Sequence, residues 1–328
     1  MVAHPAVRTG PGVALHPDVR DDVRDDVRGD VRDDVLDDLG AGRRHERVGT
    51  GCAAPLDDMD DAHDAHDAHD AHDARTSEPG EGDLRRLARR VAAPGATAPL
   101  GVYLFRSADP GAELARHVER VVFLETFGNT AELLAKEYGP YEDSSIFFCV
   151  IDHRRMVPAG TMRVLLPSKA GFKSSDDVEP LWGEPLRDMA TRTGLDIDLA
   201  KTWDIATLAV APDYRGKATM GLVSMGLYQA LALATPPCGI EWLVAILDVP
   251  VFRMIRWKLR MPMAGFKDVP AQPYLGSPAS MPVWCNVSDT ERRIAASDPA
   301  LHALYFKGVG LEPAVRPLDV STAVDLVA

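Results

Sequence analysis

The chain has 328 residues, of which 46% are hydrophobic, and a formal net charge of -13 at pH 7. Residues 1–80 hold 20 acidic and 9 basic side chains, so nearly all of the excess negative charge lies there and the rest is close to neutral. A near-neutral body of this length can bury a sizeable core and lacks the basic balance typical of nucleic-acid-binding proteins. We therefore expect no nucleic-acid partner.

The cysteines and the N-terminus indicate the compartment. The four cysteines are far apart and form no CxxC pair, which argues against a disulfide framework or a zinc module. The first residues, MVAHPAVRTG, lack a charged segment followed by an apolar one, and no run of about 18 apolar residues occurs. We expect a cytoplasmic protein without a membrane span.

Residues 1–80 are of low complexity. Residues 18–39 repeat every four positions (DVRDDVRDDVRGDVRDDVLDDL), and residues 61–74 repeat every three (DAHDAHDAHDAHDA). Such a segment cannot bury enough apolar surface to fold, so we expect a disordered tail. Its imidazoles and carboxylates can bind metal ions, which leaves metal storage as an alternative role, and an acidic regulatory arm as another. For the rest of the chain we expect no metal requirement.

Hydrophobic spacing and Gly/Pro breaks predict the elements that follow. In chain order they are a helix at 84–91, a strand at 100–106, a helix from Asp109 to about Glu125, a helix at 129–139 with Asn129 and Glu132 as its capping box, and strands at 144–152 and 158–167. Residues 168–200 are mixed, with a helix at about 185–193.

The second half alternates more regularly. Its predicted elements are a strand at 203–210, a helix at 218–234, a strand at 240–247, a helix that begins at Asp248 as its cap, a Pro-interrupted strand pair over 273–287, and short helices at 288–296 and 297–306. This order predicts an α/β sandwich with more strands than a simple doubly wound fold.

The junction TWDIATLAVAPDYRGKATMGLVSMGLYQALALA (202–234) passes from a strand to a long helix through Pro212, Arg215, Gly216 and Lys217. Helix-start amides beside basic side chains can bind a phosphate. The alternative is that this segment only turns a corner.

This order of elements, with Val210 and the turn residues above, resembles the GNAT superfamily of N-acyltransferases. The segments RVVFLE, AGTMRVLLP and TWDIATLAV resemble, more narrowly, the branch of acyl-homoserine-lactone (autoinducer) synthases and long-chain N-acyl amino acid synthases, over roughly residues 100–285. The resemblance implies a GNAT-like mixed, mostly antiparallel twisted sheet flanked by helices over 81–328, of α/β (α+β) class.

The resemblance also implies a donor site. In the superfamily the turn after the fourth strand binds the donor phosphates, and the fourth and fifth strands splay to admit the pantetheine arm of acyl-CoA or an acyl-carrier protein. The corresponding positions here are Leu208, Val210, Arg215, Gly216, Lys217, Ala218, Thr219 and Met220. Ala218 and Met220 stand where the family usually has glycine or a small residue, and this bulk is more compatible with the single phosphate of a carrier protein than with tight binding of coenzyme A.

Three side chains are candidates for catalysis on the same resemblance. Asp204 is the candidate base or amine orienter, Arg163 on the neighbouring strand is its expected ion-pair partner, and Glu125 is a second carboxylate. A structural Asp204–Arg163 pair is the alternative. The helix after the fifth strand offers no tyrosine as the general acid that many superfamily members place there.

Arg253, Arg256 and Arg260 recur at helical spacing after the fifth strand. They could dock an acidic carrier protein, or form an ordinary solvated face. The leading hypothesis is an N-acyltransferase that moves an acyl group from acyl-CoA or acyl-carrier protein to the amine of a small metabolite, such as an amino acid. The alternative is a catalytically silent GNAT-like module for ligand sensing or assembly.

Overall fold

The computed structural model describes residues 79–216 and 221–327. The expected disordered tail, up to residue 78, and the predicted donor residues Lys217 to Met220 lie outside this range. The helices are α1 (Glu81–Val91), α2 (Ala112–Phe127), α3 (Ala131–Tyr138), α4 (Lys173–Trp182), α5 (Leu186–Thr193), α6 (Leu222–Ala234), α7 (Val249–Trp257), α8 (Val287–Ser297), α9 (Pro299–Phe306) and α10 (Val320–Val327).

The strands form one mixed sheet. They are β1 (Leu100–Arg106), β2 (Ser145–Asp152), β3 (Val157–Leu165), β4 (Thr202–Val210), β5 (Trp242–Asp248), β6 (Ala264–Gly265), β7 (Gln272–Tyr274), β8 (Ser277–Asn286) and β9 (Val315–Arg316). Their order is β6-β8-β5-β4-β3-β2-β1-β9, with β7 paired to β8. Neighbours are antiparallel except β4–β5 and β1–β9, which confirms the predicted mixed, mostly antiparallel sheet.

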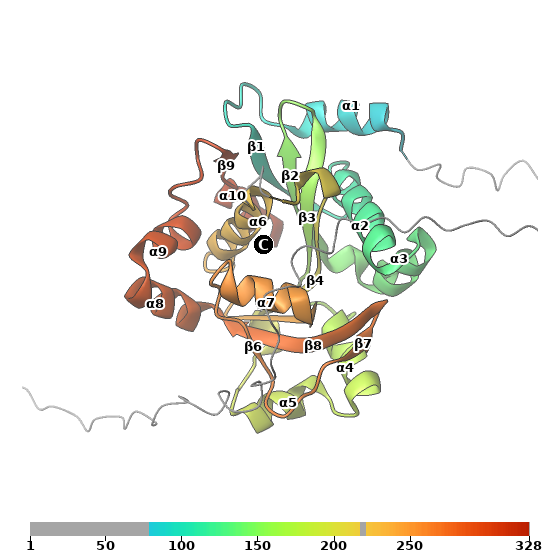
Figure 1. Cartoon of the computed structure of the whole chain (residues 1–328), viewed down its shortest axis with the longest axis vertical. Coiled ribbons are helices and arrows are strands. Elements are labelled where there is room, and N and C mark those ends of the chain that lie inside the picture. Colours follow the sequence, from blue (N-terminus) through green and yellow to red (C-terminus); the bar gives the residue numbers. More distant parts are fainter. Residues whose placement is uncertain (1–78, 217–220, 328) are drawn as a thin grey trace, which may run out of the picture. The chain divides into compact units, whose positions relative to one another are not determined.

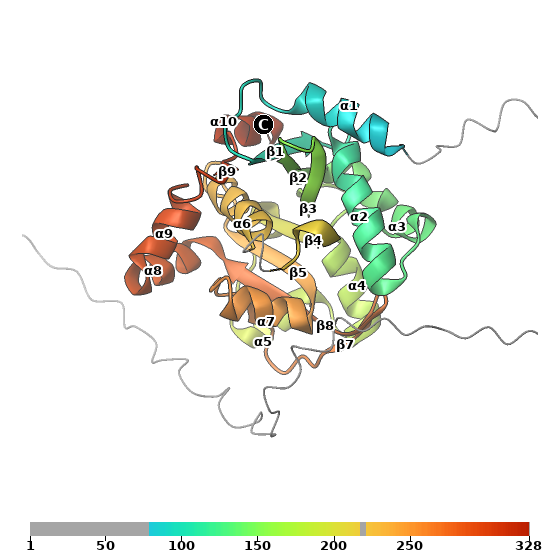
Figure 2. The same cartoon turned by 45° about the horizontal axis from the view of Figure 1, so that its top comes forward.

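Helices cover both faces of the sheet (Figures 1 and 2). On one face α6 to α10 pack on the main core, and on the other face α1 and α2 cover β1 to β3 while α4 and α5 cover β5 and β8. Two covered faces explain why every residue of the central strand β2 is buried, and why its residues 146–151, IFFCVI, are a continuous apolar run.

Gly160 allows α6 to lie close to the sheet. A Cβ at this position of β3 would be 2.4 Å from Val223 Cγ1 of α6 and 3.1 Å from the Ala209 carbonyl oxygen of β4. The position therefore accepts hydrogen but not a methyl group without a shift of the helix.

The structure refines the predicted starts of three helices. Thr130 rather than Asn129 caps α3, and the Asn129 amide instead donates to the Leu275 carbonyl of the β7–β8 turn. Asp248 is the N-cap residue of α7, as predicted, but its side chain makes no cap bond and its Oδ1 accepts from Ser277 instead. The predicted start of the long helix after β4, at residue 218, lies outside the described residues, in which this helix begins at Leu222, after Gly221 with a φ of 73°.

Candidate functional site

The β4–β5 cleft is the space that opens where these neighbouring strands stop pairing. Residues 202–204 of β4 pair with residues 242–244 of β5, and within the described strands no later pair joins them, although they continue to Val210 and Asp248. Beyond the fork β4 stays paired with β3 and β5 with β8, so the sheet divides into two halves. A cavity of about 80 Å³ lies in the fork.

The walls of this cleft are mostly apolar. Residues 205–208 of β4 and 246–248 of β5 face it, and four aromatic rings close it, namely Phe123, Phe127, Tyr138 and Tyr274. A few polar groups, among them those of Thr207, Asp248 and Ser277, also line it. Such a lining suits a ligand arm that is largely apolar and is oriented by a small number of hydrogen bonds.

A β-bulge lies in the β4 wall of the cleft. Arg163 is opposite Thr207 and Val164 is opposite Ile205, so Ala206 is an extra residue with no partner position on β3. The Tyr138 hydroxyl donates to the Ala206 carbonyl at 3.4 Å. A bulge bends its strand and re-aims peptide groups and side chains, and here it does so in the middle of the cleft wall.

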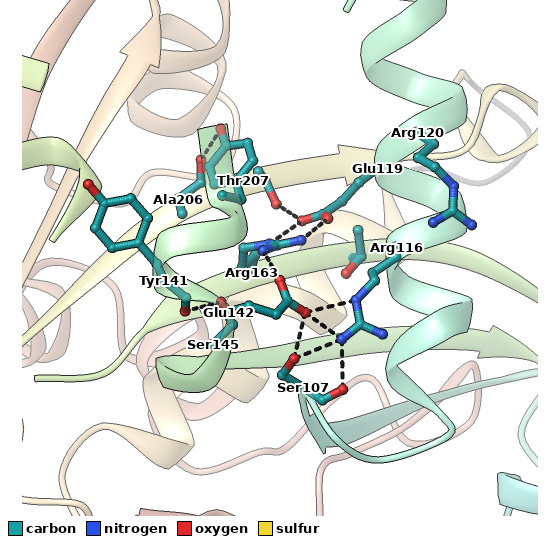
Figure 3. A network of polar contacts seen from close by, with 12 residues as sticks. Ser107, Arg116, Glu119, Arg120, Tyr141, Glu142, Ser145, Arg163, Ala206 and Thr207 are labelled. Atoms are coloured by element: carbon teal, nitrogen blue, oxygen red, sulfur yellow. Dashed lines mark hydrogen bonds and ion pairs between the residues drawn. The ribbon is translucent and has the colours of Figure 1, made fainter. Parts of the chain in front are cut away.

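A buried ionic network supports the bulge from the α2 side, and we call it the Arg163 network (Figure 3). Arg163 Nε and Nη2 donate to the two carboxylate oxygens of Glu119 at 3.1 and 2.7 Å, and its Nη1 donates to Glu142 Oε2 at 2.9 Å. The Thr207 hydroxyl donates to Glu119 Oε1. The guanidinium also lies over the rings of Tyr138 and Phe147, with distances of 4.9 and 4.6 Å to their centroids.

Charge and burial make this network a fixed scaffold. The Arg163 and Glu119 side chains are only 5% and 4% exposed. Burial by itself lowers the pKa of Arg163, but the nearby carboxylates of Glu119 and Glu142 hold it above its usual value. A paired, fully bonded charge of this kind costs much to disrupt and has no proton to exchange near neutral pH.

The expected Arg163–Asp204 ion pair is wrong. The bulge at Ala206 places Arg163 opposite Thr207, whereas Asp204 is opposite Leu165, on the far side of the irregularity. Arg163 therefore reaches Glu119 of α2, and Asp204 finds its partner on α4.

Asp204 caps α4 from outside the helix. Its Oδ2 accepts from the Ser174 backbone amide at 2.8 Å, and its Oδ1 accepts from the Ser174 hydroxyl at 2.6 Å. The N-cap residue of α4, Phe172, offers no side-chain acceptor, so Asp204 supplies what the local sequence lacks. Complete burial raises the pKa of Asp204 to about 6, against the lowering effect of the Ser174 bonds. Asp204 is not among the residues that line the cleft.

The turn after β4 lies beyond the cleft residues 205–208. Pro212–Tyr214 form one 3-10 turn, Arg215 Nε donates to the Val210 carbonyl at 2.7 Å, and Gly216 has a φ of 115°. Leu208 lines the cleft, and Val210 is half-buried at the end of the strand. Of the predicted donor residues, the structure thus brings Leu208, Val210, Arg215 and Gly216 into one continuous segment along the cleft and the turn.

The third catalytic candidate, Glu125, is exposed near the end of α2. The carboxylate of α2 that faces the sheet is Glu119, six positions earlier, which the sequence interpretation missed. A signal was present, because Glu119 falls on the same helical face as Ala112, Ala115 and Val122. A charged residue on an apolar stripe needs a buried partner.

Two tyrosines of the cleft were also missed. Tyr138 is the last residue of α3 and Tyr274 is the last residue of β7. Neither is on the helix after β5, where the family resemblance would place a tyrosine. Burial raises the pKa of both phenols above the ordinary value, and nearby carboxylates act in the same direction. Both therefore remain protonated near neutral pH.

The predicted arginine stripe is interrupted. Arg253 and Arg256 are exposed on α7, but the helix ends at Trp257, and Arg260 has a φ of 57° and pairs with Asp298 at 2.5 Å. The exposed cationic face of α7 is thus shorter than the helical spacing of the three arginines predicted.

Two kinds of feature are absent from residues 79–216 and 221–327, namely a metal-binding cluster and a membrane-spanning helix. No group of three or more His, Cys, Asp or Glu side chains in these ranges is arranged to hold a metal ion. No helix in the same ranges is both long and apolar enough to cross a membrane.

No protein-family model matches the sequence, and no curated protein matches it. Among solved structures, the chain is similar to a CoA-dependent acyl-homoserine lactone synthase, BjaI, solved with SAM and isopentyl-CoA, at 16% identity and a TM-score of 0.45 over 69% of this chain and 98% of that one. It is also similar to FeeM, an N-acyl amino acid synthase from uncultured soil microbes, at 12% identity and a TM-score of 0.45 over 62% and 98%.

A third similar structure is the acyl-homoserine lactone synthase LasI, at 14% identity and a TM-score of 0.38 over 58% of this chain and 91% of that one. Two of these three structures are thus acyl-homoserine lactone synthases, and the third is an N-acyl amino acid synthase.

Proposed function

We propose that the protein is an N-acyltransferase that moves an acyl group from a pantetheine thioester to the amine of a small molecule. The observation that carries this proposal is the fork between β4 and β5. Beyond the fork, the backbone N–H and C=O groups on the side of β4 that faces β5 do not pair with β5. They can bind an extended ligand arm that carries amides, in the same way as they would bind another strand. The apolar walls then accept the hydrocarbon part of the acyl group.

The donor phosphates are assigned to the turn after β4. Leu208 and Val210 lead from the cleft to Arg215 and Gly216, at the start of the segment whose amides and basic side chains would meet a phosphate. Lys217, Ala218, Thr219 and Met220 remain part of this assignment. Either coenzyme A or the phosphopantetheine of a carrier protein presents the required arm and phosphate.

The chemistry requires placement more than a strong acid. A thiolate leaves readily, so the protein has to bring an amine to the thioester carbon and stabilise the tetrahedral oxyanion. We assign the oxyanion to backbone amides at the Ala206 bulge, which interrupts the cleft wall next to Thr207.

The three predicted catalytic residues receive different roles in this proposal. Arg163 is a positioning residue, because it holds the bulge through Glu119 and Thr207. Asp204 is also a positioning residue, since it fixes the start of α4. Glu125, which is exposed, has no role in the transfer.

A direct test combines donor binding with product analysis. The full chain is incubated with a series of acyl-CoA thioesters and acyl-carrier proteins and a panel of amino acids and simple primary amines, and N-acyl products are sought by mass spectrometry. Isothermal titration calorimetry measures donor binding separately. We expect donor binding and at least one amide product.

A matched pair of variants locates the donor. Leu208→Trp fills the cleft and is expected to abolish donor binding, whereas Leu199→Trp, on an exposed residue of the turn Leu199–Lys201, is expected to bind the donor like the wild type. Equal binding by both variants would contradict a donor in the cleft. Donor binding without any product would favour the silent sensing module.

A further inference from the structure

A second, larger cavity adjoins the β4–β5 cleft, and we call it the outer cavity. It has a volume of about 590 Å³ and lies between Glu137 of α3, Asp177, Pro180 and Leu181 of α4, and the β7–β8 turn. Tyr274, Leu275 and Ser277 line both the cleft and the outer cavity. Tyr274 therefore stands where the two spaces meet.

Polar contacts from α4 hold Tyr274 in place. Its hydroxyl donates to Asp177 Oδ2 at 2.5 Å, and the Lys173 ammonium contacts the same oxygen at 2.7 Å. Lys173 also pairs with Glu137 at 2.7 Å and lies 5.4 Å from the Tyr138 ring and 6.0 Å from the Tyr274 ring. The carboxylate that accepts the Tyr274 hydrogen bond is thus fixed in position.

The Tyr274 oxygen can serve two partners at once. A phenol that donates one hydrogen bond can still accept another, so its oxygen can take a hydrogen from a ligand while its own proton points to Asp177. Burial, together with Tyr138, Asp177 and Asp204, raises the pKa of Tyr274, which keeps the phenol neutral. A neutral phenol between a ligand and a carboxylate is suited to relay a proton.

The lining of the outer cavity indicates the kind of ligand. Glu137 and Asp177 outnumber the single buried cation Lys173, so the local charge is negative and attracts an ammonium group. The other side chains of the wall are apolar or small, including Pro180, Leu181 and Pro273. This combination favours a primary amine on an apolar body over an acceptor with several carboxylates.

We propose that the acceptor amine enters through the outer cavity and that Tyr274, backed by Asp177, is the catalytic proton acceptor of the acyl transfer. This inference rests on the proposed function. The bound ammonium first loses one proton to water. The neutral amine nitrogen then forms a bond to the thioester carbon, and the carbon–sulfur bond breaks with its electron pair going to sulfur. The amine proton passes to the Tyr274 oxygen as the phenol proton passes to Asp177, and Asp177 returns it to water or to the thiolate.

Two variants of the full chain test the relay. The rate of amide formation is measured with octanoyl-CoA and n-hexylamine, and donor affinity is measured by calorimetry. Tyr274→Phe and Asp177→Asn are expected to lower kcat by about 100-fold, the usual worth of general base catalysis, with donor affinity unchanged. In Asp177→Asn the side chain keeps an oxygen that can accept from the Tyr274 hydroxyl, but it cannot take up a proton. If the contact were purely structural, this variant would therefore keep the wild-type rate of amide formation. Tyr305→Phe, a buried tyrosine of α9, is the matched control and is expected to retain the wild-type rate.

Entry through the outer cavity has its own measurement, which needs no turnover. Binding of n-hexylamine to the donor-free protein is expected to weaken about two- to fivefold in Glu137→Gln, the worth of a partly exposed ion pair, and to stay unchanged in Glu179→Gln, on α4 outside the cavity. Equal binding by these two variants overturns the entry route.

The remaining outcomes separate the relay from the proposed function. Wild-type kcat in Tyr274→Phe or Asp177→Asn overturns the relay alone. A wild-type protein that binds the donor but acylates no amine overturns the proposed function and the relay with it.

Discussion

The two polar clusters beside β4 differ in how completely their charges are satisfied. In the Arg163 network the guanidinium is bonded to Glu119 and Glu142, and Arg163 and Glu119 are almost inaccessible to solvent. In the cluster of Lys173, Asp177 and Tyr274 the carboxylate is partly exposed and faces a cavity. The two clusters contain similar residue types but differ in role. The Arg163 network is a fixed structural element, whereas the carboxylate in the cluster of Lys173, Asp177 and Tyr274 is accessible to a ligand.

This difference follows from solvent access rather than from residue identity. A buried ion pair must have all its hydrogen bonds made within the protein, so its partners are fixed and both groups stay charged. A charge at the wall of a cavity can exchange a water contact for a ligand contact at little cost. The predictions below test this contrast.

The largest effect is expected from Arg163→Met. The replacement leaves Glu119 buried without its cation, which costs about 3 to 5 kcal/mol in the free energy of unfolding. Urea unfolding measures this loss, and the double variant Arg163→Met with Glu119→Gln is expected to recover much of it. A single variant as stable as the wild type would show that the network does not hold the sheet.

The next effect concerns Asp204 and pH. Since burial raises the pKa of Asp204 from 3.8 to about 6, the folded protein keeps a proton that the unfolded chain loses between these values. This group therefore makes the free energy of unfolding fall as pH rises from about 4 to about 6, by up to about 3 kcal/mol. Urea unfolding of both proteins between pH 4 and pH 6 measures this dependence. We expect the fall in the free energy of unfolding that Asp204 causes to be present in the wild type and absent in Asp204→Asn.

The same variant separates two roles of Asp204. Asparagine can still accept from the Ser174 amide, so acyl transfer is expected to persist if Asp204 only caps α4. Loss of transfer by a folded Asp204→Asn protein would restore Asp204 as the catalytic base and contradict its positioning role.

Lys173→Met is the counterpart of Arg163→Met in the other cluster. The carboxylates it leaves behind, Glu137 and Asp177, are 24% and 22% exposed and can be hydrated. We expect a loss of only about 1 kcal/mol in urea unfolding, near the value of an exposed ion pair. A loss as large as that of Arg163→Met would remove the distinction between the two clusters.

The smallest effect is expected from Thr207→Val, which keeps the shape of the side chain and removes its hydroxyl. Glu119 loses one donor but keeps Arg163, so the free energy of unfolding should fall by about 1 kcal/mol. Thr207→Ser keeps the hydroxyl and serves as the control. Equal stability of the valine and serine variants would show that this hydrogen bond does not contribute.

Helices and strands with strong periodicity could be predicted without the structure, and the sheet around β2 to β5 agrees with that prediction. The helix α4 could not, because it contains Pro180 and its capping group, Asp204, is 30 residues away in sequence. The cleft between the fourth and fifth strands was expected from the family resemblance. Tyr274 was not, since it reaches the cleft from a short strand after the main motifs.

The sequence by itself determined which residues are apolar, where most of the strands and helices lie, and that a basic, glycine-containing turn follows the fourth strand. These properties depend on local periodicity and on the backbone preferences of glycine and proline. Only the tertiary structure decided the partners of the buried charges. One extra residue at Ala206 changes the register, which places Arg163 beside Glu119 and leaves Asp204 to cap α4. A bulge leaves no clear local signal, because it arises from the pairing of two strands that are far apart in the chain.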